Sequence, residues 1–564
     1  MASISEAMPK NIIGYAKRNF ICLLFCGLFN SANAQARDSL FGIPTSLGSG
    51  GTVSGTTSCD FGGYDQAFLT VHLDDGRIIL VGDTRLGGES DFAIARLMPD
   101  GQYDQILGPD GKVRIDLGYS NDSCLTASQY QSDWILMGGC VKQTSMAGYV
   151  NLIARIDLNG KLDSSFGNGG YLTIDLPTAP HEMITKIRPL PDGRIIIAGN
   201  TLYGSLDFSD SAGVFLGRLL SNGEVDSSFG VGGFVYPRWE PGCNASLLGD
   251  AITDDQERIL LTGASYEPYL GSQEGTNNCT HNIFLFRYLS NGQADPNFGN
   301  NGSVELLYTA RGRGNALLLY EDGRILLAGA AGDLLLPFPA YAFIARFMPD
   351  GAPDLSFGDN GRFKRGIITY GLSGGAVEPF GLLRMRDRVV VGVSNEITGD
   401  DPGFGAICLT EDGKIDSMFG NQGRFNAFPD LPLQSYINQI SGSADNNFFL
   451  SGYTRLLQPN NMTIVKVRWD VVSNTIEQSL PNGLNIHPNP VQNGFFRIEL
   501  SGMIANEENL QLKVRNINGR ILYEQSKVTH YDIVETSQFP SGIYLVELTG
   551  QRSRYVGKFV VQNK

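Results

Sequence analysis

Short apolar segments separated by glycine-rich turns recur along most of the chain. Residues 183–238 contain four of them, "MITKIRPL", "GRIIIAGN", "GVFLGRLL" and "GGFVYPR". Apolar runs of this length bounded by Gly, Asn and Asp are typical of β-strands. Four consecutive strands joined by turns predict one antiparallel sheet, which is the unit of a β-propeller blade.

This unit of four segments repeats roughly every 60 residues, and a period in this range made of strands indicates a propeller or a solenoid. The most regular part is the connection between the third and fourth segments, with an Asp-Gly or Asn-Gly turn, an aspartate and, in five copies, a Phe-Gly pair. Six copies of this connection lie at residues 99–111, 158–170, 221–233, 290–302, 349–361 and 411–423. We therefore expect an all-β protein built around a β-propeller.

The two ends of the repeat region predict how the ring closes. Residues 36–55 begin with the end of a repeat that has no beginning, and residues 436–470 form a repeat that lacks its ending. We infer that an N-terminal strand around residues 50–56 completes the last blade. Seven blades result, with six and eight as alternatives because the second and sixth copies are degraded.

An arginine precedes the repeated aspartate by eight residues in five copies. A fixed offset across a turn predicts a charge-assisted hydrogen bond between the two side chains. Because the pair occurs in one blade after another, we interpret these acids as structural rather than catalytic. The pairs are Arg96 with Asp104, Arg155 with Asp163, Arg218 with Asp226, Arg287 with Asp295 and Arg346 with Asp354. In the sixth copy Cys408 replaces the arginine, so Asp416 should lack this partner.

The repeat resembles the delta-60 repeat family, whose copies carry this Asp-Gly, Asp and Phe-Gly pattern. The resemblance covers roughly residues 36–470. It implies a propeller-like fold and little about activity.

The N-terminus has the pattern of a secretory signal peptide. Lys10, Lys17 and Arg18 precede an apolar run at 20–29, and an Ala-x-Ala cleavage site ends before Gln35. The run is too short to span a bilayer, which needs about 20 apolar residues, so we expect removal of residues 1–34 and no transmembrane segment. The net charge of −15 at pH 7 disfavours nucleic acid as a partner.

Export permits disulfides, because the periplasm and the cell exterior are oxidising. Six cysteines follow residue 34. We expect Cys124 to pair with Cys140 and Cys243 with Cys279, because each pair falls within one repeat. Six cysteines allow fifteen connectivities, so other pairings stay open.

The repeat ends near residue 476, and a tail of alternating strands follows a linker at 477–484. The pattern of this tail predicts a small immunoglobulin-like β-sandwich. The tail also resembles the C-terminal sorting domain of type IX secretion cargo in Bacteroidota, on the residues Pro488, Asn489, Pro490, Asn518, Gly519, Gly542, Tyr544 and Lys558. That resemblance implies the type IX secretion machinery as a partner and delivery through the periplasm to the cell surface or the medium. An ordinary adhesive module is the alternative.

The expected layout is a signal peptide at 1–34, a delta-60-like propeller at 35–476 and a sorting domain at 485–564. Function is expected on the propeller face that bears the second connection of each blade and the links between blades, because these loops differ from copy to copy. Aromatic side chains beside carboxylates in these loops are candidates to stack on sugar rings or to meet a protein partner. They are Tyr203, Trp239, Tyr266, Tyr269, Glu240 and Glu267. The alternative is that these aromatic residues cover loop backbone.

Signals for catalysis are few. The five histidines lack metal-ligand spacing, and the sequence has no serine elbow, phosphate loop or dinucleotide fingerprint, so we expect no metal and no cofactor. We predict a secreted or cell-surface binding or interaction module whose ligand the sequence does not name; a glycan and a surface protein are the candidates. The alternatives are a carbohydrate-active enzyme that uses carboxylates on the variable face, and a structural protein of a surface layer or matrix.

Overall fold

The structure is a computed structural model, and strands are the regular secondary structure of the residues it describes. These residues fall into two compact units, one within residues 36–469 and the other within 470–564. In the first unit the described residues are 45–46, 52–53, 56–108, 110–119, 121–142, 148–177, 179–203, 212–237, 245–266, 282–306, 312–331, 341–358, 362–366, 376–396, 404–416, 419, 423–426, 434–443, 447–455 and 460–468. In the second they are 484–487, 491, 495–500, 510–516, 520–528, 533–549 and 554–561.

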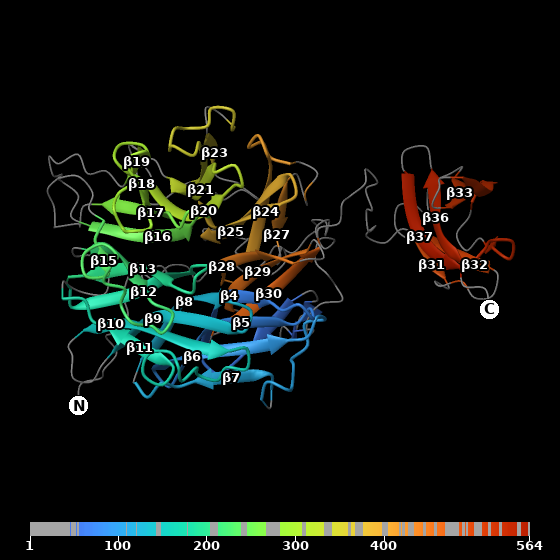
Figure 1. The fold of residues 1–564 in the computed structure, drawn as a ribbon. Coiled ribbons are helices and arrows are strands. Elements are labelled where there is room, and N and C mark those ends of the chain that lie inside the picture. The colour runs from blue at the N-terminus through green and yellow to red at the C-terminus, as the bar shows by residue number, and fades with distance from the viewer. Residues whose placement is uncertain are drawn as a thin grey trace, which may run out of the picture. The chain divides into compact units, whose positions relative to one another are not determined.

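The first unit contains seven antiparallel sets of four strands, which we number as blades 1 to 7 (Figure 1). A parallel pairing of Tyr149 with His181 joins blades 2 and 3 into one eight-stranded sheet. Blade 1 contains β4 (Tyr64–His72), β5 (Ile78–Leu86), β6 (Glu89–Leu97) and β7 (Lys112–Ile115); blade 2 contains β8 (Asp122–Tyr130), β9 (Trp134–Lys142), β10 (Tyr149–Asp157) and β11 (Tyr171–Ile174). Blade 3 contains β12 (His181–Pro189), β13 (Ile195–Leu202), β14 (Ala212–Leu219) and β15 (Phe234–Val235); blade 4 contains β16 (Ala245–Thr253), β17 (Ile259–Tyr266), β18 (Asn282–Tyr288) and β19 (Ser303–Leu306). Blade 5 contains β20 (Gly312–Leu319), β21 (Ile325–Ala331), β22 (Tyr341–Phe347) and β23 (Arg362–Gly366); blade 6 contains β24 (Ala376–Met385), β25 (Arg388–Glu396), β26 (Phe404–Thr410) and β27 (Arg424–Asn426). Blade 7 contains β28 (Gln434–Gly442), β29 (Asn447–Arg455), β30 (Asn461–Arg468) and β3 (Thr56–Cys59).

The first strands of the blades form the closed inner ring of a propeller. Each of these strands contacts the first strand of the next blade, and β28 of blade 7 contacts β4 of blade 1. In Figure 1 the last blade, in orange, accordingly lies beside the first blade, in blue. The expectation of an all-β propeller with seven blades is confirmed.

The last blade is completed from the other end of the chain, as expected. Strand β3 pairs antiparallel with β30, from Thr56 opposite Val465 to Cys59 opposite Met462. The pairing begins at residue 56, which is the last residue of the strand predicted around residues 50–56. Upstream of it, β1 (Thr45–Ser46) and β2 (Thr52–Val53) pair with each other instead.

Apolar runs in the second and third strands follow from packing between neighbouring blades. All of β13 is buried, with Ile195 and Ile197 on one face and Ile196 and Ala198 on the other. Ile197 belongs to a core cluster shared with blade 2, and Ala198 belongs to one shared with blade 4. A strand covered on both faces reads as a continuous apolar run, which explains the sequence "IIIAG".

The glycine that ends this run is required by the inner strand. Each first strand has a β-bulge, which in blade 3 lies between Ile184 and Lys186, opposite Gly199. A Cβ atom on Gly199 would lie 2.0 Å from the Met183 carbonyl oxygen. Gly329 has the same relation to the Arg313 carbonyl, at 1.9 Å. The glycine thus lets the bulged strand approach its neighbour.

The connection between the third and fourth strands, which we call the corner, joins each blade to the next. In blade 2, Arg155 donates from Nε to the Oδ2 of Asp163 at 2.7 Å, and from Nη1 to the Ser221 carbonyl of blade 3 at 2.6 Å. The same Nε to Oδ2 bond is 2.7 to 2.8 Å long in Arg96–Asp104, Arg218–Asp226, Arg287–Asp295 and Arg346–Asp354. The second bond recurs too, from these arginines to the carbonyls of Leu158, Ser290, Pro349 and Glu411.

The corner phenylalanine completes this contact between blades. Phe166 is fully buried in the core cluster of blades 2 and 3, with the Arg155 guanidinium 4.7 Å from its ring centroid. A Cβ atom on Gly223, in the turn of blade 3, would lie 3.1 Å from the Phe166 ring. The adjacent Gly167 N–H donates to the carbonyl of Asn222 in that turn at 2.8 Å. The turn glycine therefore makes room for the ring, and the backbone closes over it.

The sixth corner has a different cation. Asp416 accepts a hydrogen bond of 2.6 Å from Nε of Arg388, which lies at the start of the neighbouring strand β25. Cys408, in the place of the usual arginine, is buried. Asp416 is thus bound by an arginine from a different strand, whose side chain is 28% exposed.

The expected disulfide between Cys124 and Cys140 is wrong, since both are free thiols. In the pairing of β8 with β9, Cys124 lies opposite Gly139, and Cys140 lies opposite Ser123. Successive residues of a strand point to opposite faces of the sheet, so the two sulfur atoms lie on different faces. Cys243 and Cys279 lie outside the described residues.

The C-terminal unit is a β-sandwich, as its pattern predicts. One sheet contains β31 (Leu484–His487), β32 (Phe495–Leu500) and β35 (Ile533–Glu535); the other contains β33 (Gln511–Asn516), β34 (Ile521–Ser526), β36 (Gly542–Thr549) and β37 (Arg554–Val561). Phe496 and Ile498 of the first sheet share a core cluster with Leu512 and Val546 of the second.

We expect the corner pair to matter more where the arginine is buried. Replacing Asp226 by alanine leaves the guanidinium of Arg218, 6% exposed, without its carboxylate, which costs about 3 kcal/mol or more of unfolding free energy. Asp416→Ala leaves Arg388, whose side chain is 28% exposed, with its second partner Asp387, and should cost about 1 kcal/mol or less. Urea unfolding of the two variants checks this difference, and equal losses would contradict it.

Candidate functional site

The two faces of the propeller differ in how their carboxylates are held. The corners lie on one face, where Asp226 is typical: the Ser228 hydroxyl, with the Ser228 N–H and the Arg218 guanidinium, lowers its pKa against the opposing effect of burial. The opposite face, which we call the variable face, carries the second connection of each blade and the links between blades. The carboxylates described below lie there, where strands β4, β8 and β12 begin.

Of the six predicted ligand residues, the structure describes the side chain of one. Tyr203 follows β13 and is 48% exposed. Tyr266 ends strand β17, and its side chain lies outside the described part of the structure. Trp239, Glu240, Glu267 and Tyr269 lie wholly outside the described residues. Grouping of these six side chains therefore stays a prediction.

Three residues of the sorting motif lie in paired strands of the sandwich. Gly542 and Tyr544 belong to β36, and Lys558 belongs to β37. Tyr544 is buried, and its hydroxyl donates to the Pro540 carbonyl at 2.7 Å. Pro488, Asn489, Pro490, Asn518 and Gly519 lie outside the described residues.

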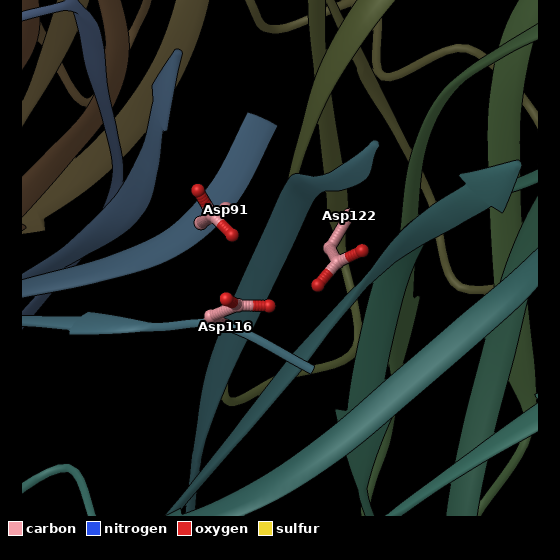
Figure 2. A group of neighbouring side chains, drawn as sticks. All are labelled: Asp91, Asp116 and Asp122. Atoms are coloured by element: carbon pink, nitrogen blue, oxygen red, sulfur yellow. The ribbon is translucent and has the colours of Figure 1, made fainter. Parts of the chain in front are cut away.

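The structure brings together three aspartates that sequence reasoning missed. Asp91 lies on β6, Asp116 follows β7, and Asp122 begins β8, so the group spans blades 1 and 2 at the variable face. One carboxylate oxygen from each lies within 4.8 Å of the others. Figure 2 shows the carboxylates of Asp116 and Asp122 turned toward each other, with Asp91 beside them.

The three carboxylates have few donors. Asp91 accepts from Nε of Arg114 at 2.5 Å, and Asp116 accepts from the Gly118 N–H at 2.7 Å. Asp122 accepts from the Leu117 N–H through Oδ2 at 2.9 Å. Its Oδ1 has no hydrogen-bond partner among the described residues, although Asp122 is fully buried. Asp91 is 2% exposed, whereas Asp116 is exposed.

Burial raises the pKa of Asp122 to about 7, and the carboxylates of Asp91 and Asp116 add to the effect, while the Leu117 N–H and Arg114 oppose it. Burial also raises the pKa of Asp91, against Arg114. This local excess of buried negative charge distinguishes the group from the paired corner aspartates.

Blades 1 and 3 have a carboxylate at the position that Asp122 occupies in blade 2. Two residues before the bulge of the inner strand stand Asp65, Asp122 and Glu182, and each is fully buried. Each accepts from a backbone N–H of the segment that enters its blade: Phe61 at 2.8 Å, Leu117 at 2.9 Å and Leu176 at 2.8 Å. Burial raises the pKa of Asp65 to about 6 and that of Glu182 to about 8. These acids anchor the links between blades.

A second charged group lies on the inner strands of blades 3 to 6. Asp250 accepts from Nη2 of Arg188 at 2.9 Å, and Nζ of Lys186 lies 3.6 Å from the same oxygen. Arg313 of β20 lies 3.7 Å from Glu378 of β24. In this group the charges of both signs are paired across neighbouring blades, so it ties inner strands together.

One signal in the sequence pointed to the aspartate group. Asp91 stands five residues before the corner arginine, where the next blades have Val150, Gly213, Asn282 and Tyr341. An acid inside an otherwise apolar third strand is an anomaly that comparison of the copies reveals. The partners Asp116 and Asp122 carry no such signal, because acids recur at or near their positions.

The sheets define a seven-bladed β-propeller followed by a β-sandwich. Comparison with protein families finds a secretion system C-terminal sorting domain over residues 485–562, and a β-propeller domain of unknown function over residues 73–105 and 190–229. The recognition of a propeller with a type IX sorting tail is confirmed. The sorting domain indicates secretion or attachment to the outer-membrane surface, and no membrane-spanning helix occurs in the described part of the chain.

Comparison with curated proteins finds no match. Among solved structures, an α-L-arabinofuranosidase from Fusarium graminearum is 8% identical with a TM-score of 0.36, covering 61% of this chain and 91% of its own. An α-L-arabinanase from Penicillium chrysogenum is 9% identical with a TM-score of 0.34, covering 60% and 91%. An exo-1,5-α-L-arabinanase from a bovine ruminal metagenomic library is 12% identical with a TM-score of 0.25, covering 50% and 90%. At these values the similarity carries no argument about activity.

The buried acids predict a dependence of stability on pH. Because folding raises the pKa of Glu182 to about 8, the folded state holds its proton more tightly than the unfolded chain, where glutamate titrates near about 4.3. Its contribution is therefore full below pH ~4.3 and is lost as the pH rises through about 8. We expect the thermal midpoint of chelator-treated protein to fall as the pH is raised from about 5 to 8. In Glu182→Gln the midpoint should fall less over this pH range. An equal fall in the variant and the unaltered protein would contradict the prediction.

Proposed function

We propose that the propeller is a binding module, exported by the type IX route, whose ligand surface lies on the variable face. One observation carries this proposal: three of the carboxyls with a raised pKa, Asp65, Asp122 and Glu182, are fully buried, and each accepts from a backbone N–H. A catalytic acid must reach its substrate. These three are closed to a substrate and serve the fold.

The corner face offers less for recognition. Its carboxylates are paired with arginines in five successive blades, and its loops repeat one design. The variable face carries connections that differ between blades, and Tyr203 is half-exposed at the edge of one of them. Aromatic side chains of this kind combine a large apolar surface with a hydroxyl, and they are enriched at interfaces.

A carbohydrate-active enzyme would need two accessible carboxyl groups flanking the scissile bond. Within the aspartate group Asp116 is exposed, while Asp91 and Asp122 are 2% and 0% exposed. A single accessible carboxylate does not make such a pair, so binding without turnover is the function we favour.

Binding of the mature full-length protein to a glycan array and to an outer-membrane fraction tests the proposal. The variant Tyr203→Ala combined with Trp239→Ala and Tyr266→Ala alters the variable face. Ile106→Ala is the matched control, because Ile106 is 84% exposed on a corner. We expect the triple variant to lose at least tenfold in affinity, because truncation removes the aromatic contact surface, and the control to bind as the unaltered protein does. Equal binding by all three proteins would contradict the placement, and no binding by any would favour a structural role.

A further inference from the structure

We propose that Asp91, Asp116 and Asp122 form a binding site for a divalent cation, Ca²⁺ by preference, which links blade 1 to blade 2 at the variable face. The proposal is independent of what the propeller binds. It rests on the convergence of the three carboxylates, on an oxygen atom left without a donor, and on a comparison with the next blade junction.

The charge of the group favours a divalent ion. Three carboxylates meet one cation, Arg114, which contacts Asp91 through its guanidinium. Two negative charges therefore remain uncompensated when all three acids are ionised. Asp91 and Asp122 are buried, and buried charges in proteins are paired or coordinate metals.

The junction of blades 2 and 3 shows what this position requires. There Glu182 replaces Asp122 and accepts from the Leu176 N–H, as Asp122 does from Leu117. Glu182 also accepts a hydrogen bond of 2.8 Å from Nδ2 of Asn151. The side-chain amide thus supplies a second hydrogen-bond donor to the buried carboxylate.

That amide has no counterpart at the first junction. Asn151 stands four residues before Arg155 and pairs with Ile174, and Phe92 stands four residues before Arg96 and pairs with Ile115. The phenylalanine offers no donor. Oδ1 of Asp122 is accordingly without a hydrogen-bond partner among the described residues, and the neighbouring position holds a further carboxylate, Asp91. A cation would satisfy both groups.

The ligand atoms suit calcium. Ca²⁺ binds oxygen at 2.3 to 2.6 Å, so two oxygens on one ion lie at most about 5 Å apart, and the three carboxylate oxygens lie within 4.8 Å of one another. Mg²⁺ binds at about 2.1 Å and demands octahedral geometry, which would require the oxygens to draw closer. Histidine and cysteine, which favour zinc, do not belong to the group. The exposed Asp116 leaves room for water ligands.

Calcium titration of the mature full-length protein after treatment with a chelator tests the proposal. We expect saturable Ca²⁺ binding by calorimetry and an upward shift of the thermal midpoint, because an ion that binds the folded state alone stabilises it. Mg²⁺ at the same concentration should give a smaller shift. Absence of Ca²⁺ binding, or equal shifts with both ions, would overturn the proposal.

Three variants test where the ion binds. Asp122→Asn and Asp116→Asn should each weaken Ca²⁺ binding at least tenfold, because each removes one charged ligand. Glu182→Gln is the matched control at the second junction and should bind Ca²⁺ as the unaltered protein does. Asp116 is exposed, so its variant decides the question if Asp122→Asn does not fold. Unchanged binding in Asp116→Asn, or equal loss in Glu182→Gln, would show that the ion lies elsewhere.

Discussion

The ring depends on a buried arginine that holds two blades at once. In each of five corners its Nε binds the aspartate of its own blade, and its Nη1 binds a backbone carbonyl of the next. A guanidinium suits this task because its donors are fixed in one plane and point in two directions. In four of these corners a buried phenylalanine lies against the guanidinium and excludes water, and in a medium of low dielectric constant hydrogen bonds are stronger. Repetition of this arrangement sets blades 1 to 6 against one another in the same way.

Half of this arrangement could be read from the sequence. The arginine lies at a fixed place before the turn that holds the aspartate, so their offset of eight residues is visible in five copies. The second acceptor could not be read, because it is a backbone carbonyl of residues as different as Ser221, Pro349 and Glu411. Arg388 illustrates the same limit: it binds Asp416 from another strand, so no fixed offset within the corner announces it. The failed disulfide has a related cause, since the register that places Cys124 opposite Gly139 is a property of two paired strands.

The aspartate group was harder to foresee than the fold. Its members come from the third strand of one blade, the end of its fourth strand and the start of the next blade, where inter-blade packing brings them together. Asp116 and Asp122 do not stand out in a chain with 58 acidic residues, and Asp91 stands out through comparison of the copies alone. What distinguishes the group is a missing donor, and this emerges when Phe92 is compared with Asn151 in the equivalent place. The ligand residues proposed from loop composition depend on loop geometry, which the repeat pattern does not determine.

The pairing of β3 with β30 links residues 56–59 to residues 462–465, so the ring closes late in synthesis. Until residue 465 is available, the outer edge of blade 7 cannot form, and β3 presents unpaired backbone groups. Such an edge is a template for pairing with other chains. The two ends of the ring are therefore the part most prone to pair with other chains during synthesis and export. A chain that ends before the seventh blade leaves β3 with an unpaired edge. The order of the domains suits this problem, since every strand of the ring precedes the sorting domain in the sequence.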